Sequence, residues 1–190
     1  NLMANAAQIA AWAPQLVEGR EIMLTALPLA HAYSLTVCMM YSVTRGYTQV
    51  LVPDARDLVN ILKVVDHHKP TIFPGVPTLY NAISRHRHVV DGKYDLTSIT
   101  TCLSGAAALP PDVKHRFEEV TGGRLVEGYG LSEASPVTHA NPLDGTDRIG
   151  MIGLPLPGTD CRIVDEAPET VTLGPGERGV LCVAGPQVMV

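Results

Sequence analysis

The chain has 190 residues, of which 46% are hydrophobic and 17% are charged, a balance typical of a globular protein and not of a disordered one. Its formal net charge is -5 and no cluster of Lys and Arg stands out, which argues against nucleic acid as the main partner. No run reaches the roughly 18 apolar residues that would span a bilayer. From the length we expect one large domain, or one and a half small ones, with a buried core.

Cysteine usage and the ends of the chain set two further expectations. Four cysteines lie far apart and form no C-x-x-C pair, and their apolar surroundings predict buried, reduced thiols in a reducing cytoplasm: Cys38, Cys102, Cys161 and Cys182. Asn1 is not a natural start, no signal-peptide pattern follows it, and Val190 closes an unfinished apolar run. We therefore expect the chain to be a segment of a longer protein.

The first quarter of the chain predicts helices and strands in alternation. Apolar residues at helical spacing predict a helix over 1–12, and a short buried strand is expected over 21–27. A largely apolar helix follows over 32–45 and ends at Gly46, before a strand over 47–52.

The middle of the chain continues this alternation. Asp54 can cap a helix whose apolar face includes Leu58 and Val65, and a short strand is expected over 71–73. The series is completed by a helix that starts near Pro77, a strand over 98–103, a helix that begins after Pro110 and ends at Gly122, and a strand over 124–127.

Strands that alternate with helices predict an α/β fold with a mostly parallel sheet and helices on its faces. After Pro142, short β runs separated by glycines and prolines predict part of an antiparallel, barrel-like piece. We expect residues 1–145 to form the α/β subdomain and residues 146–190 to form the start of the barrel-like subdomain, which would be incomplete.

The stretch VEGYGLSE combines an aromatic ring, a hydroxyl and a carboxylate. Gly128 and Gly130 flank Tyr129, which predicts a loop whose backbone is free to adopt conformations closed to other residues. A ring close to Ser132 and Glu133 suits a purine nucleotide, with the ring on the base, the hydroxyl on a phosphate and the carboxylate on Mg²⁺. The same residues would also make an ordinary turn with an exposed acidic residue.

A second segment of small residues, 104–109, also follows a predicted strand directly. Ligands of parallel sheets bind beyond the carboxyl ends of the strands, so we expect both segments to lie at the same edge of the sheet. Gly105, Ala106 and Ala107 have almost no side chain, and a planar base could lie against their backbone. This coincidence favours the nucleotide interpretation over the turn.

Two histidines and one serine need separate weighing. His31 follows Pro28 at a strand-to-helix turn, where it is either bonded locally or a polar group at the mouth of the pocket. The segment GLSEA is one residue short of a G-x-S-x-G nucleophile elbow, because Ala134 replaces the second glycine. A serine hydrolase built on Ser132 would need a base such as His139, and the chain ends without an evident Asp-then-His order.

The chain resembles the adenylate-forming enzymes, most closely the fatty acid–CoA ligases. Six pieces carry this resemblance in family order, over nearly all of the 190 residues. They are Leu27 to His31, which resembles the P-L-x-H segment; Gly75 to Tyr80, the G-V-P-T helix start; Ser104 to Leu109, the S-G-G-A-P-L adenine loop; Glu127 to Glu133, the Y-G-[LM]-[ST]-E motif; Gly150 to Val164, the glycine- and proline-rich segment ending in I-V-D; and Gly176 to Met189, the opening of the G-E-L…G-P-x-V-M segment.

The resemblance implies an ATP-dependent acid–thiol ligase. A carboxylic acid would attack the α-phosphate of ATP with Mg²⁺ to give an acyl-adenylate and pyrophosphate, and coenzyme A would then take the acyl group. Catalytic roles would fall to His31 near the carboxylate, Ser132 at the α-phosphate and Glu133 as the ligand of Mg²⁺. The nucleotide would be bound by Gly105, Ala106, Ala107, Glu127, Gly128, Tyr129, Gly130 and Ser132, with Tyr129 stacked on adenine.

The same resemblance implies partners and missing parts. The partners would be small molecules (a fatty acid, ATP and coenzyme A) and not nucleic acid; weak peripheral association with a membrane and a homodimer stay open. The phosphate loop would lie before Asn1, and the ribose-binding Asp and the domain with the catalytic Lys after Val190. We therefore expect the chain alone to be inactive. Ala106 stands where the family usually has Gly, and Ala30 where Phe is more usual before the histidine.

Rival functions remain from the sequence. An amino-acid-activating domain would be expected to carry a selectivity residue for the amino group, usually Asp, over 32–37, and no Asp is present there. The remaining rivals are an aryl-acid adenylating domain, a non-catalytic nucleotide-binding module and the serine hydrolase. The acyl pocket is expected to be built from 32–40, 76–83 and 130–137, whose apolar character favours a fatty or aryl acid.

Overall fold

The predicted alternation of helices and strands is present in the computed structural model, which describes residues 1–166 and 171–189. Strands β1 (Ile22–Thr25) and β2 (Thr48–Leu51) pair in parallel, and so do β3 (Thr101–Ser104) and β4 (Arg124–Gly130). Parallel bridges from Ile72 to both β1 and β3 join the two pairs. The segment 71–73 therefore lies in the sheet as predicted, but through single bridges and not as a regular strand. The predicted α/β fold with a parallel sheet is confirmed.

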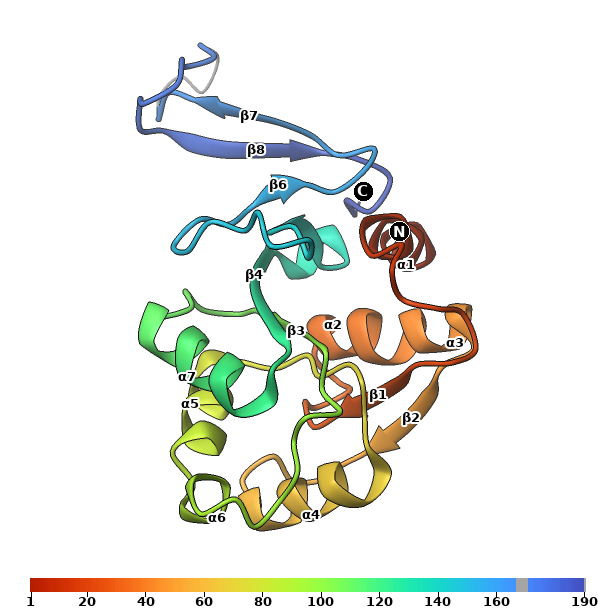
Figure 1. The fold of residues 1–190 in the computed structure, drawn as a ribbon. Helices are drawn as coiled ribbons and strands as arrows, with labels where there is room; N and C mark the ends of the chain where they lie inside the picture. Colours follow the sequence, from red (N-terminus) through yellow and green to blue (C-terminus); the bar gives the residue numbers. More distant parts are fainter. Residues whose placement is uncertain (167–170, 190) are drawn as a thin grey trace.

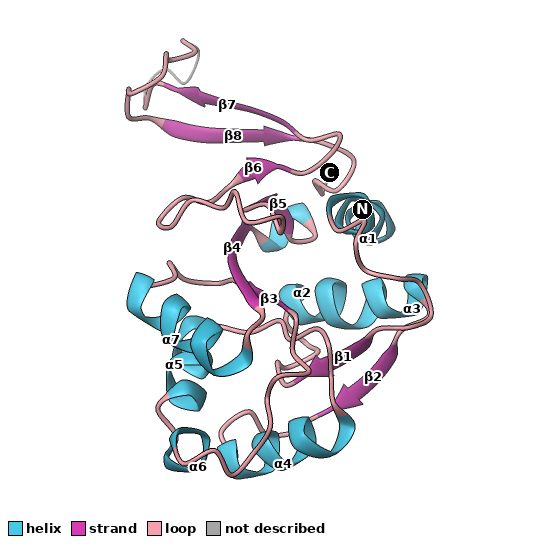
Figure 2. Ribbon diagram, viewed as in Figure 1, coloured by secondary structure: helices cyan, strands magenta, loops and turns pink. Residues whose placement is uncertain are grey.

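Helices cover both faces of this sheet (Figures 1 and 2). Neighbouring residues of β1 point to opposite faces: Leu24 belongs to the larger core cluster and Met23 to a second one. The larger cluster packs against α4 (Leu58–His68), α5 (Pro77–Ser84), α6 (Arg87–Val90) and α7 (Pro111–Thr121). The second cluster includes residues of the helical segment 32–45 and of α1 (Leu2–Trp12) together with the segment just after it.

The predicted helix over 32–45 is present but is not a uniform α-helix. It consists of α2 (Ala32–Ser34), a π-helical segment η1 (Leu35–Met40) and α3 (Tyr41–Arg45). Gly46 ends it with a φ of 64°, the left-handed conformation that glycine adopts without strain. Apolar spacing does not reveal a π-helical segment, which is why the sequence pattern did not predict it.

Helix α4 is capped by a different aspartate from the predicted one. Asp57 Oδ1 accepts the backbone N–H of Asn60 at 3.0 Å, as an N-cap side chain should. Asp54 instead accepts the N–H of Arg56 and pairs with its guanidinium at 3.0 Å. The prediction that Asp54 caps the helix is therefore wrong, because residues 54–57 form a turn that moves the helix start along the chain.

Strand pairing changes direction at β4. This strand pairs antiparallel with β5 (Val137–Ala140), which pairs antiparallel with β6 (Leu154–Pro155). Strands β7 (Asp160–Val164) and β8 (Val180–Ala184) form a separate hairpin, seen at the top of Figure 1. The strands described here close no barrel. Residues 167–170 and 190 of the predicted barrel-like subdomain lie outside the described residues, and the boundary at 145/146 stays a prediction.

Burial of the cysteines follows this division. Cys38 and Cys102 are buried free thiols, as predicted. Cys161 is an exposed free thiol and Cys182 is only half-buried, so the prediction of burial is wrong for Cys161 and holds only in part for Cys182. Its apolar neighbours come from a hairpin strand that is largely exposed, not from a core. Among the described helices, none has the length and apolar character needed to cross a membrane.

Candidate active site at the end of strands β3 and β4

A cleft of about 330 Å³ opens where β3 and β4 end. Ser104 at the end of β3 lies in register with Glu127 of β4, so the two predicted small-residue segments share one sheet edge. Most of the predicted site residues line this cleft. The residues that line it are His31, Tyr33, Leu103, Gly105, Ala106, Gly128, Tyr129, Gly130, Leu131, Ser132, Glu133, Pro136 and Val137.

The glycines around Tyr129 are needed for a reason other than the predicted one. Gly128 and Gly130 belong to β4 and neither has a positive φ, so this stretch is strand and not loop. A Cβ on Gly130 would lie 2.0 Å from the carbonyl oxygen of Pro136, and one on Gly128 would lie 2.9 Å from Leu103 Cδ1. Close approach of neighbouring segments, not backbone freedom, therefore requires glycine here.

The small-residue segment after β3 is shaped by Tyr33 beneath it. A Cβ on Gly105 would lie 3.1 Å from the Tyr33 ring, so the ring supports the bare backbone. The Tyr33 hydroxyl donates to the Leu103 carbonyl oxygen, and burial raises its pKa well above the usual value, so it stays a neutral donor. Ala106 has a φ of 68°, a conformation that costs a residue with a Cβ about 1 kcal/mol or more.

Two predicted nucleotide-binding residues do not line the cleft. Ala107 is exposed next to it, and Glu127 points its carboxylate at the neighbouring segment, where Oε2 accepts the N–H of Leu109 at 3.2 Å. This bond fastens the end of the 104–109 segment to β4. Glu127 therefore holds the edge of the cleft in place within the structure, and any direct contact with a nucleotide stays a prediction.

His31 lies at the mouth of the cleft and also lines a smaller pocket of about 190 Å³ next to it. Its Nδ1 accepts the backbone N–H of Tyr33 at 3.1 Å, which caps the first turn of α2. A nitrogen that accepts this bond carries no proton, so the ring proton of the neutral form sits on Nε2. Both interpretations from the sequence are thus compatible: a local cap through Nδ1 and a donor for a ligand through Nε2.

Ser132 and Glu133 form a short 3-10 turn, η2 (Ser132–Ala134), at the rim of the cleft. Both side chains are exposed, and within the described residues neither makes a hydrogen bond or ion pair. The backbone of Glu133 is held by the far end of the chain, because its carbonyl oxygen accepts the N–H of Met189 at 2.7 Å. A free carboxylate at a cleft suits Mg²⁺ that shares its coordination with phosphates, as Mg²⁺ usually does. The described part holds no group of three or more His, Cys, Asp or Glu that would bind a metal by itself.

His139 is buried behind Tyr129 and does not act on Ser132. The two residues Tyr129 and His139 are opposite each other on β4 and β5, with ring centroids 6.1 Å apart. His139 Nδ1 is bonded to the Thr138 hydroxyl at 2.9 Å, and burial lowers the pKa of its imidazole. A nucleophile and its base need a direct hydrogen bond, and none joins Ser132 to a histidine in the described chain. The geometry therefore gives no support to the serine hydrolase.

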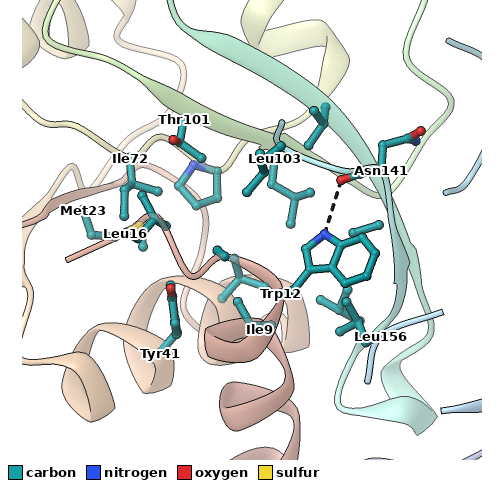
Figure 3. Close-up of a pocket in the computed structure, with 17 residues that line it drawn as sticks. Ile9, Trp12, Leu16, Met23, Tyr41, Ile72, Thr101, Leu103, Asn141 and Leu156 are labelled. Carbon is teal, nitrogen blue, oxygen red and sulfur yellow. Dashed lines mark hydrogen bonds between the residues drawn. The ribbon is translucent and has the colours of Figure 1, made fainter. Parts of the chain in front are cut away.

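An apolar cavity of about 50 Å³ lies next to the cleft (Figure 3). Leu103 and Val137 line both spaces, so these two side chains form the wall between them. The expected acyl segments 32–40 and 130–137 contribute Val37 and Val137 to it. Its other lining residues are Ile9, Trp12, Ala13, Leu16, Met23, Tyr41, Ile72, Pro74, Thr101, Val126, Ala140, Asn141, Leu143 and Leu156.

Sequence patterns missed part of this arrangement. From the expected acyl segment 76–83, Val76 lines the small pocket beside His31, and no residue of the segment lines the cleft or the apolar cavity. Leu79, Tyr80 and Ile83 are packed in the large core cluster instead. Leu103 and Trp12 were not predicted to be near the site. Leu103 precedes a motif residue directly, which is a usable signal, whereas nothing local marks Trp12.

Known proteins place this cleft in a family. The family model of AMP-binding enzymes matches residues 1–190. The chain is 50% identical over 190 residues to a long-chain-fatty-acid–CoA ligase of Bacillus subtilis (strain 168), and 36% identical over 190 residues to one of Escherichia coli O157:H7. Both matches cover 100% of this chain and 33% of the relative, so the chain spans about a third of the length of these curated relatives.

Solved structures agree with the sequence relatives. A benzoate CoA ligase from Burkholderia xenovorans is similar to this chain with a TM-score of 0.84 at 26% identity, over 98% of this chain and 38% of that one. A match of the family model over the whole chain, together with this fold and cleft, leads to one conclusion. The chain therefore belongs to the family of AMP-binding enzymes.

Proposed function

We propose that the full-length protein containing this chain is a fatty acid–CoA ligase. It activates the acid as an acyl-adenylate and transfers the acyl group to coenzyme A. The observation that carries this proposal is the cleft with Tyr129, Ser132 and Glu133 on its rim, directly beside a cavity lined mainly by aliphatic and aromatic side chains. Relatives named as long-chain-fatty-acid–CoA ligases support the same acid class.

The first half-reaction joins the acid to AMP. A carboxylate oxygen forms a bond to the α-phosphorus of ATP while the bond to the β-phosphate oxygen breaks, and pyrophosphate leaves with the electron pair. Tyr129 stacks on adenine, and the backbone of Gly105 and Ala106 lies against the other face of the base. Ser132 donates to an α-phosphate oxygen. These contacts position the reactants, which is the larger part of catalysis in phosphate chemistry.

Charge at the phosphates is balanced from the chain and from Mg²⁺. Glu133 is the residue that would hold Mg²⁺, which when bound offsets negative charge on the phosphates. His31 donates from Nε2 to the carboxylate of the acid, because Nδ1 is already engaged with Tyr33 N–H. In the second half-reaction the sulfur of coenzyme A bonds to the acyl carbon and loses its thiol proton to solvent, and AMP leaves with the electrons of the carbon–oxygen bond.

An assay of the full-length protein tests the proposal. With palmitate, ATP, Mg²⁺ and coenzyme A we expect stoichiometric pyrophosphate, AMP and palmitoyl-CoA. Amino acids and benzoate in place of palmitate test amino-acid and aryl-acid activation, because a protein of either kind would turn over its own acid faster than palmitate. Binding of ATP without turnover of any acid would contradict the proposal and favour the non-catalytic nucleotide-binding module.

We also propose that the protein acts in the cytoplasm, attaches weakly to membrane surfaces and forms a homodimer. The two buried free thiols fit a reducing compartment. Cell fractionation tests the location, sedimentation with lipid vesicles tests the attachment, and light scattering during size-exclusion chromatography tests the dimer.

A further inference from the structure

Three spaces adjoin one another between the cleft and the far surface of the molecule. The cleft and the apolar cavity share Leu103 and Val137 as their common wall. On its other side the apolar cavity shares Trp12 and Leu143 with a surface pocket of about 350 Å³. Between the candidate active site and the solvent at the end of α1, these lining residues therefore form two thin partitions. One consists of Leu103 and Val137, and the other of Trp12 and Leu143.

The partition on the cleft side is purely aliphatic. Leu103 and Val137 carry no polar group that would lose a hydrogen bond if an alkyl chain passed between them. Beyond them the chain would meet mainly aliphatic and aromatic side chains, where transfer of methylenes from water is favourable. A fatty acid whose carboxylate lies at His31 thus has an apolar route away from the nucleotide.

The partition on the far side is held more firmly. The indole Nε1–H of Trp12 donates to the carbonyl oxygen of Asn141 at 3.3 Å, the dashed line of Figure 3. The Asn141 side chain is itself bonded to the carbonyl oxygens of Glu127 and Met151, at 3.1 and 2.6 Å. The Asn141 carbonyl oxygen that accepts the indole N–H is therefore held in place by the side-chain hydrogen bonds of Asn141.

Helix α1, which ends at Trp12, is anchored to the same sheet. Asn5 donates to the Val137 carbonyl oxygen at 2.7 Å and accepts the Val137 N–H at 3.0 Å, so its amide pairs with β5 as a strand would. Gln8 adds bonds to Pro157 and Gln187. The indole is consequently fixed relative to Val137 on the opposite wall of the cavity.

We propose that Trp12 sets the upper limit of acyl-chain length by closing the far end of the apolar cavity. The inference rests on the proposed function. Each methylene that enters the apolar cavity should raise kcat/KM by about fourfold until the chain meets the indole, and the gain should stop there. Removing the indole joins the cavity to the surface pocket and lets longer chains continue outward.

The experiment measures kcat/KM of the full-length protein for saturated acids from eight to twenty-two carbons. Trp12→Ala should move the optimum to longer acids and lower the discrimination against the longest by about tenfold or more. Leu143→Ala thins the same partition, leaves the indole and its hydrogen bond intact, and should move the optimum the same way. Trp12→Phe, which keeps a ring, should keep the wild-type optimum. An unchanged optimum in both alanine variants overturns the inference.

Failure of the inference can be told from failure of the proposed function. If the wild-type protein forms no acyl-adenylate from any acid, the proposed function is wrong; if it does and the chain-length profile ignores position 12, only the inference is wrong. Fluorescence of Trp12, the single tryptophan of these 190 residues, gives a binding readout that is independent of turnover; in the full-length protein it is obtained as the difference between wild type and Trp12→Phe. Palmitate brominated near its methyl end should quench this fluorescence more than palmitate brominated next to the carboxylate. Equal quenching, or none, contradicts the inference.

Discussion

Two different constraints at single residues decide which small side chains the cleft needs: space for neighbouring atoms and backbone conformation. Gly130 and Gly128 leave room for neighbouring atoms, at Pro136 O and Leu103 Cδ1, and do so at ordinary φ. Ala106 is the reverse case, because it adopts a left-handed φ of 68° although it has a Cβ. The family motif that it resembles has glycine at this position, which such a φ explains.

Replacing Ala106 by Gly should stabilise the chain. The variant removes strain at a φ of 68° but adds freedom to the unfolded chain, so we expect a net gain of up to about 1 kcal/mol in the free energy of unfolding. Urea unfolding of both proteins measures it. Ala107→Gly is the matched control: Ala107 is also exposed but has no positive φ, so glycine there should lower stability by a few tenths of a kcal/mol. Equal losses in the two variants would refute the assignment of strain to Ala106.

His139 should make stability depend on pH. Burial lowers the pKa of its imidazole in the folded chain below the ordinary value of about 6.5. The unfolded chain therefore binds the proton first as the pH falls, so this contribution is complete above pH of about 6.5 and is lost below it. Between about pH 7.5 and about pH 5.5 the free energy of unfolding should fall less in His139→Gln than in the wild type. The difference between the two proteins should be at most about 1.4 kcal/mol per pH unit. If the free energy of unfolding, measured with urea, falls equally in both proteins as the pH is lowered, His139 does not contribute to the pH dependence.

At the scale of elements, a buried lysine joins three segments behind the cleft. Lys114 on α7 donates to Glu118 Oε1 at 2.8 Å, to Asp147 Oδ2 at 3.1 Å and to the Leu125 carbonyl oxygen of β4 at 2.6 Å. The side chains of Lys114 and Asp147 are only 7% and 9% exposed, so the charges depend on one another. This group holds helix α7 and the segment after β5 against β4.

Removing this lysine should destabilise the chain strongly. Lys114→Ala leaves two carboxylates without their buried partner, and we expect a loss of about 3–5 kcal/mol in the free energy of unfolding. Lys69→Ala is the control, because Lys69 also pairs with two aspartates but its side chain is 45% exposed. It should lose less than about 1 kcal/mol. A similar loss in both variants would mean that burial does not set the strength of the Lys114 group.

Elements with strong periodic patterns could be predicted, and their internal details could not. The helix over 1–12 is found as Leu2–Trp12 and the helix before Gly46 ends there, because spacing and a left-handed glycine are local signals. The π-helical segment η1 and the cap by Asp57 depend on how the segments pack and turn, which local spacing does not show. The end of β4 was predicted as a loop because its glycines are a local sign of a flexible backbone. They are glycines because atoms of Leu103 and of the segment leading into β5 approach them closely, and these contacts have no local sequence signal.

At the scale of the whole molecule, the cleft lies where the sheet changes from parallel to antiparallel pairing. β4 takes part in both, through β3 on one side and β5 on the other. The two ends of the described chain meet beside it: Asn1 donates to the Val188 carbonyl oxygen at 3.2 Å, and Met189 N–H bonds to Glu133 (Figure 1). The rim residue Glu133 is thus placed by a segment more than fifty residues later in the sequence.

Motifs predicted which polar residues meet, while the apolar surroundings came from the fold. His31, Tyr129, Ser132 and Glu133 line one cleft as the sequence led us to expect. Trp12 reaches the neighbouring cavity only because α1 is bonded to β5 through Asn5 and Val137. Contacts between segments so far apart have no local sequence signal, which is why the cavity and its far wall could not be predicted.

The central claim is that this cleft is an adenylation centre with Glu133 as its metal ligand, and one comparison tests it most directly. Fatty-acid-dependent pyrophosphate release is measured in the full-length protein for wild type, Glu133→Gln and Glu119→Gln, the last being an exposed glutamate on α7 outside the cleft. We predict that Glu133→Gln lowers turnover by about 100-fold or more at ordinary Mg²⁺, with an unchanged unfolding transition, and that Glu119→Gln is as active as wild type. Equal activity in all three proteins would contradict the account.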